Sequence, residues 1–239
     1  MRAIVGAMTH IDDEMGGRTA RRSFLGRLLA GGTALTLIGA GPHRAAAEEI
    51  PVGQDVPAGE DWMRELTAKH RVAFDWSAHK NGKPLSQGKN YLDAWRDAFK
   101  VTEHDVNLLF GVHGDAIPVV LADTLWSRYK IGEQYEVVDG ATKLPAVRNV
   151  FTVVNAAAGG LVAPAESVES LQKRGARFLV CRNTVAGATK KLAAAGLGGA
   201  DEIRAAILGG LLPGVILVPA MLVTLTQLQE RGVRYLKVA

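Results

Sequence analysis

The stretch NLLFGVH, residues 107–113, decides the fold class of this chain. It is a nearly continuous apolar run of strand length, and such runs are typical of strands buried on both faces of a parallel sheet. Further β-prone runs stand at 71–76, 177–181, 215–218 and 234–238. The sequence therefore predicts five strands.

Amphipathic or apolar stretches of helical spacing separate these strands. The predicted helices cover 91–99, a stretch through Trp126 and Tyr129, 167–174, 184–195, 203–211 and 220–231. Strands that alternate with helices of this length predict an α/β fold. We expect a flavodoxin-like, mostly parallel five-stranded sheet with helices on both faces. Residues 130–165 carry no pattern that assigns them to an element.

The front of the chain, residues 1–47, has the order of an export signal. A charged region leads to Arg21-Arg22 and Phe24-Leu25, then to a short apolar stretch, and Ala45-Ala46-Ala47 forms an A-x-A cleavage site. The paired arginines and the offset of Phe24 resemble the twin-arginine consensus. The apolar stretch is shorter than the roughly 20 residues that span a membrane. We therefore expect a periplasmic protein with no membrane partner once the signal is removed.

The composition of the exported part limits its function. The chain has 28 basic and 24 acidic residues, and because residues 1–47 hold six and three of them, residues 48–239 carry 22 and 21. With a net charge of +1 and no basic stripe, nucleic-acid binding is excluded. Residues 48–69 are polar and rich in Pro and Gly, which predicts an arm outside the core that turns helical at 61–69. Residues 70–239 then form one domain.

The candidate site lies where the predicted strands end. Ligands of open parallel sheets bind outside the carboxyl ends of the strands, where this chain has Asp75, His113, Asp115 and Cys181. Asn183 or Thr184 could cap the helix after Cys181, and that helix N-terminus together with Arg182 would stabilise a thiolate. His113 could serve as a base for Cys181. Alternatively, Cys181 is a buried, inert residue, and His113 caps a carbonyl.

Other kinds of site find little support in the residues. The histidines show no metal-ligand spacing, and the single Cys181 can form neither an internal disulfide nor a structural zinc site. The GLGG stretch at 196–199 follows a helix and not a strand, so it is not a phosphate-binding loop. We expect no metal and no cofactor.

From the predicted strand at 107–113 to the C-terminus, about two thirds of residues 48–239, the chain resembles the DsrE/DsrF-like family, small α/β proteins of sulfur metabolism. The residues that carry the resemblance are FLVCRNT (178–184), LLPGV (211–215), Val218-Pro219, LQERG (228–232) and Tyr235-Leu236. The resemblance implies a flavodoxin-like sheet, assembly into trimers or hexamers and, for some members, sulfane sulfur carried as a cysteine persulfide. Cys181 matches the family's cysteine, and Asn183 and Thr184 match the turn after it. Arg182 departs from the small residue expected there.

Two functions follow from these observations. The first is a periplasmic carrier that accepts sulfane sulfur on Cys181 from a small sulfur compound or a protein donor, or passes it to an acceptor. If such a protein turned over as an enzyme, it would be a sulfurtransferase. The second is an oligomeric module that binds a small ligand or a partner, with Cys181 as a structural residue. No second cysteine is present to complete a sulfur relay.

Overall fold

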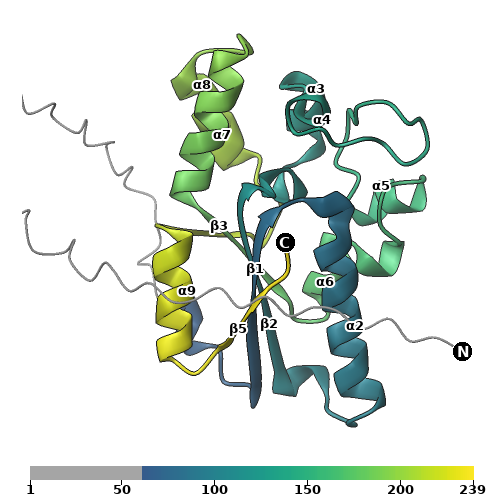
Figure 1. The fold of residues 1–239 in the computed structure, drawn as a ribbon, viewed down its shortest axis with the longest axis vertical. Coiled ribbons are helices and arrows are strands. Elements are labelled where there is room, and N and C mark those ends of the chain that lie inside the picture. The colour runs from purple at the N-terminus through teal and green to yellow at the C-terminus, as the bar shows by residue number, and fades with distance from the viewer. Residues whose placement is uncertain (1–60) are drawn as a thin grey trace, which may run out of the picture. The chain divides into compact units, whose positions relative to one another are not determined.

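The computed structural model describes residues 61–239, and within them five strands form one parallel sheet (Figure 1). The strands are β1 (His70–Ala78), β2 (Val106–Asp115), β3 (Arg177–Cys181), β4 (Ile216–Val218) and β5 (Arg234–Lys237). Their order is β4-β3-β2-β1-β5, and all four neighbouring pairs are parallel. The predicted α/β fold with a flavodoxin-like parallel sheet is confirmed. The predicted signal peptide and residues 48–60 lie outside the described residues.

Helices lie on both sides of the sheet, as predicted (Figure 1). The helices are α1 (Asp61–Arg64), α2 (Lys83–Asp97), α3 (Asp123–Arg128), α4 (Ile131–Gln134), α5 (Val153–Ala157), α6 (Val168–Lys173), α7 (Arg182–Ala194), α8 (Ala200–Gly209) and α9 (Met221–Glu230). Short 3-10 turns are η1 (Lys80–Gly82), η2 (Glu103–Asp105), η3 (Ile117–Val120) and η4 (Pro164–Glu166). One face of the sheet packs against α2 and α6, and the other packs against α1 and α9.

The face that carries α2 and α6 holds the larger core, and aromatic rings fill its centre. Phe110 of β2 is fully buried and stacks on Phe178 of β3, with ring centroids 4.6 Å apart. Phe74 and Trp76 of β1 meet the same Phe110 ring at 5.5 and 5.9 Å. Because strand side chains alternate between faces, Ala73 and Asp75 of β1 point to the α9 side.

The direction of the chain across the sheet reverses once. Strands β1 to β4 follow one another as neighbours, and α9 then leads back to β5, which pairs with the free side of β1. In parallel sheets, binding sites form outside the carboxyl ends of strands where the strand order reverses. In the described sheet this position lies between β1 and β5.

Two of the element boundaries that differ from the sequence-based predictions lie in the first part of the domain. The helix predicted at 91–99 begins at Lys83, because Pro84 stands in its first turn, where its missing N–H costs nothing. The arm was expected to lie outside the core and to be helical over 61–69. Instead α1 ends at Arg64, and Met63 and Leu66 are buried against the α9 side of the sheet.

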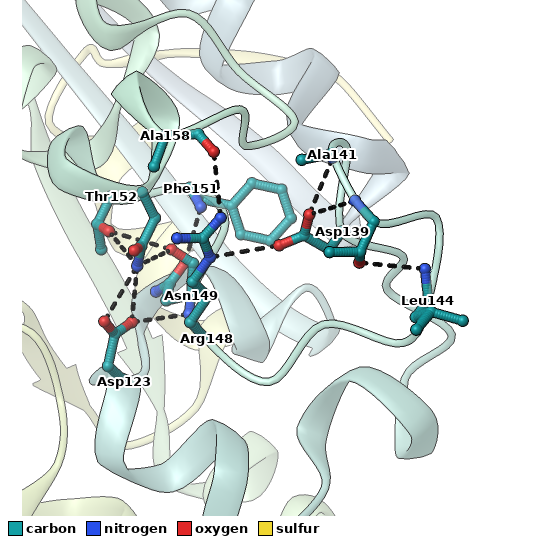
Figure 2. A network of polar contacts seen from close by, with 11 residues as sticks. Asp123, Asp139, Ala141, Leu144, Arg148, Asn149, Phe151, Thr152 and Ala158 are labelled. Carbon is teal, nitrogen blue, oxygen red and sulfur yellow. Dashed lines mark hydrogen bonds and ion pairs between the residues drawn. The ribbon is translucent and has the colours of Figure 1, made fainter.

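Residues 130–165, which the sequence left unassigned, form a loop region that includes the short helices α4 and α5 and is held by buried polar side chains (Figure 2). Asn149 is fully buried, and its Nδ2 donates to the carbonyls of Val119 (3.0 Å) and Leu121 (2.7 Å). The carboxylate of Asp139 accepts the backbone N–H groups of residues 141 and 142 and the Nε of Arg148. These bonds satisfy backbone groups that regular structure would otherwise satisfy.

Candidate functional site

The register of the sheet brings four chemically active side chains to one face, near the carboxyl ends of the strands. Asp75 pairs with Gly111, which in turn pairs with Leu179. His113 follows Gly111 by two residues, and Cys181 follows Leu179 by two. Because side chains two residues apart on a strand point to the same face, His113 and Cys181 lie on the same face as Asp75. Tyr235 of β5 pairs with Ala73 and therefore shares that face. It is the face on which α9 packs.

Three of these residues form a short chain of hydrogen bonds across β5, β1 and β2. Asp75 is 8% exposed, and its Oδ1 lies 2.6 Å from Nε2 of His113. The hydroxyl of Tyr235 donates to the other carboxylate oxygen, Oδ2, also at 2.6 Å. A buried carboxylate requires such partners, because desolvation penalises an unpaired charge. The hydrogen bond to Asp75 also raises the pKa of Tyr235, so this hydroxyl stays a donor near neutral pH.

Cys181 forms the start of α7. Its backbone is extended and its Sγ takes the N-cap position, where it accepts the backbone N–H of Thr184 at 3.3 Å. The hydroxyl of Thr184 lies 3.1 Å from the same sulfur. The residue as a whole is 3% exposed and packs among apolar residues on the α9 side. Within residues 61–239, this sulfur therefore has both polar partners and little contact with solvent.

The other predicted site residues are less closely involved. Asn183 and Thr184 were expected to cap α7, but the helix begins at Arg182 and the capping atom is the sulfur of Cys181. Arg182 is half-buried and Asn183 is exposed in the first turn of the helix. Asp115 is also exposed, and its carboxylate lies 3.7 Å from Nζ of Lys191 of α7.

Tyr235 was not among the site residues predicted from the sequence. A tyrosine on an exposed strand carries no signal of its own, and its role depends on the pairing of β5 with β1. That pairing was not predicted. Had the strand order been known, the alternation along β5 would have put Tyr235 beside Asp75.

Other candidate sites in the described part of the chain are weaker. A surface groove between α2 and α6 is lined by Lys89, Arg96 and Arg174, but all three already pair with Asp93. No group of three or more His, Cys, Asp or Glu residues within 61–239 is arranged to hold a metal ion. No helix in that same range is long and apolar enough to cross a membrane.

Comparisons with known proteins identify little. No family model matches the chain, and no curated protein matches it. Among solved structures, the chain is similar to the protein of unknown function MTH1491 from Methanobacterium thermoautotrophicum. The two are 18% identical, the alignment covers 71% of this chain and 99% of the other, and the TM-score is 0.38.

Proposed function

We propose that this chain is an exported DsrE-like protein that accepts and carries sulfane sulfur as a persulfide on Cys181. The observation that carries the proposal is the place of the sulfur at the N-terminus of α7, where it accepts the Thr184 N–H. A persulfide forms through a thiolate, and helix N-termini stabilise thiolates. With a single cysteine in the chain, the protein would carry one sulfur atom and pass it to another molecule.

The surroundings of Cys181 suit a carrier better than an enzyme with rapid turnover. The apolar packing keeps bulk water and large oxidants from the sulfur, and low exposure slows the further oxidation to which persulfides and thiolates are prone. The hydroxyl of Thr184 can rotate, so it can donate its proton to the charged sulfur of either a thiolate or a persulfide. A carrier needs this protection until an acceptor arrives.

Export and assembly are further parts of this proposal. The twin-arginine pattern at Arg21-Arg22 supports delivery to the periplasm. Exposed apolar side chains support association of several copies: Leu222 and Val223 of α9 are 74% and 57% exposed, and Leu236 of β5 is 47% exposed. Replacing both arginines by lysine in the full chain is expected to leave the protein in the cytoplasm, and periplasmic recovery of this variant would contradict export by this route.

The burial of Cys181 favours a second candidate function. At 3% exposure the cysteine resembles an ordinary small core residue. The chain would then be an oligomeric binding module whose ligand contacts the partly exposed His113 and Tyr235 at the sheet edge. In that function the thiol takes no part in the chemistry.

Cyanolysis separates the two functions. The purified protein is incubated with inorganic polysulfide, freed of excess reagent and treated with cyanide, which releases sulfane sulfur as thiocyanate. The proposal predicts one thiocyanate per wild-type chain and none from Cys181→Ser, with matching circular dichroism spectra for the two proteins. No thiocyanate from the wild type, with Cys181 alkylated only after denaturation, would contradict the carrier and support the binding module.

A further inference from the structure

The hydrogen bonds of His113 assign its tautomer. Tyr235 donates its hydroxyl proton to Oδ2 of Asp75, so Asp75 acts as an acceptor, and its Oδ1 receives the Nε2 proton of His113. In the neutral form of the ring, the second nitrogen, Nδ1, then carries the lone pair. Nδ1 has no hydrogen-bond partner among residues 61–239. The His113 side chain is 25% exposed.

His113 also lies next to Cys181 in the register of the sheet. The two residues stand one step beyond the paired Val112 and Val180, on neighbouring strands and on the same face. Neighbouring strands lie about 4.8 Å apart. The backbone N–H of Gly114 donates to Oγ1 of Thr184 at 3.3 Å, and the same oxygen lies 3.1 Å from the sulfur. The end of β2 and the thiol are therefore held together by one hydroxyl.

We infer that His113 is the acid–base residue for sulfur transfer at Cys181 and that Asp75 and Tyr235 are its positioning residues. The inference rests on the proposed function. Nδ1 removes the thiol proton of Cys181, and Asp75 stabilises the imidazolium that results, as a carboxylate does in other histidine-based sites.

The transfer step balances without an oxidant. The Cys181 thiolate attacks the outer sulfur of a donor R–S–SH, in which R is a sulfide chain or a small organic group. A new S–S bond forms on Cys181 while the S–S bond of the donor breaks, and the leaving thiolate takes the proton from His113. The sum is Cys–SH plus R–S–SH giving Cys–S–SH plus R–SH. A neutral sulfur atom moves and its oxidation state is unchanged.

The burial of Cys181 defines the class of donor. Cys181 is 3% exposed, and Met221 packs close to Gly111 on the same face of the sheet. A branched or protein-bound donor therefore cannot approach the sulfur directly. An unbranched inorganic polysulfide or a persulfide of low molecular mass needs the smallest opening to reach the sulfur. The structure therefore favours a small-molecule donor over a protein donor.

The pH dependence of this step involves more than one ionisable group. The groups that face His113 from neighbouring elements are Asp75 on β1, Tyr235 and Lys237 on β5 and Cys181 on β3, with Asp115 further along β2 itself. The first turn of α9, which packs on this face, contributes no ionisable side chain.

The test measures the rate of persulfide formation with inorganic polysulfide from pH 5.5 to 9.5 by intact mass after rapid quenching. His113→Gln is expected to lower the rate near neutral pH by about 10²- to 10⁴-fold, the usual contribution of a general base. The loss should shrink toward pH 9.5, because hydroxide can then remove the thiol proton without a neighbouring base. Asp75→Asn should lower the rate similarly, because an amide can donate to Nε2 and reverse the tautomer. Tyr235→Phe should have a smaller effect.

The outcomes separate this inference from the function on which it rests. If wild type and His113→Gln load Cys181 at the same rate and with the same pH profile, the acid–base role is wrong and the carrier function stands. If the wild type does not load, the carrier function fails and the inference falls with it. A rate loss in His113→Gln that persists unchanged at pH 9.5 would indicate a structural role for His113 and overturn the inference.

Discussion

Two glycines inside helices should respond in opposite ways to the same substitution. Gly88 lies in the middle of α2, and a Cβ added there would fall far inside van der Waals contact with Cζ of Phe110. The Phe110 ring cannot retreat, because it is fully buried and stacked on Phe178. Gly187 lies in the middle of α7, where an added Cβ meets no atom within 4 Å.

The magnitudes follow from these surroundings. Replacing a helical Gly by Ala stabilises a helix by roughly 1 kcal/mol, so Gly187→Ala should raise the free energy of unfolding by up to that amount. At Gly88 the same gain is opposed by an overpacking cost of about 1–3 kcal/mol. Gly88→Ala should therefore be less stable than Gly187→Ala by about 1–3 kcal/mol. Urea denaturation of both variants measures this difference, and a Gly88→Ala variant as stable as Gly187→Ala would refute the packing described for this core.

Three other substitutions test the loop region and the site. Asn149→Ala should lower the free energy of unfolding by about 3 kcal/mol, because three good hydrogen bonds of roughly 1 kcal/mol each are lost in a buried position; a loss under about 1 kcal/mol in urea denaturation would contradict this. Asp139 accepts two backbone N–H groups and an Arg148 bond, which lower its pKa, so its stabilising effect is present above about pH 4 and is lost as the pH falls further. The stability difference between wild type and Asp139→Asn should thus shrink below about pH 4, and a difference independent of pH from 2 to 6 would count against it. Thr184→Val removes the hydroxyl beside the sulfur and should slow polysulfide loading of Cys181 about tenfold, as measured by cyanolysis. Unchanged loading in this variant would mean that the hydroxyl does not assist the thiolate.

The sheet could be predicted from the sequence because each strand has a local signal. The run at 107–113 is nearly continuously apolar, and it belongs to the central strand β2, which has a neighbour on each side. The rule that polar residues gather at the carboxyl ends of parallel strands also put Asp75 and His113 in one region, and they are in hydrogen-bond contact. The spacing of apolar residues along a strand is a local property, so a single sequence displays it.

The rest of the site depends on contacts that a sequence does not display. Tyr235 reaches Asp75 only because β5 returns to the far side of β1. The loop region at 130–165 is held by Asn149 and Asp139, whose bonds join residues up to about thirty positions apart and follow no period. The start of α7 was misjudged because cysteine is not among the usual capping residues.

The most direct measurement of the central claim is the intact mass of the mature protein before and after exposure to polysulfide, with Cys181→Ser alongside. The proposed function predicts that the wild type gains one sulfur atom, that reductant removes it, and that the variant gains none. A wild-type mass that stays unchanged under native conditions, together with alkylation of Cys181 only after denaturation, would contradict the claim and make this cysteine a core residue.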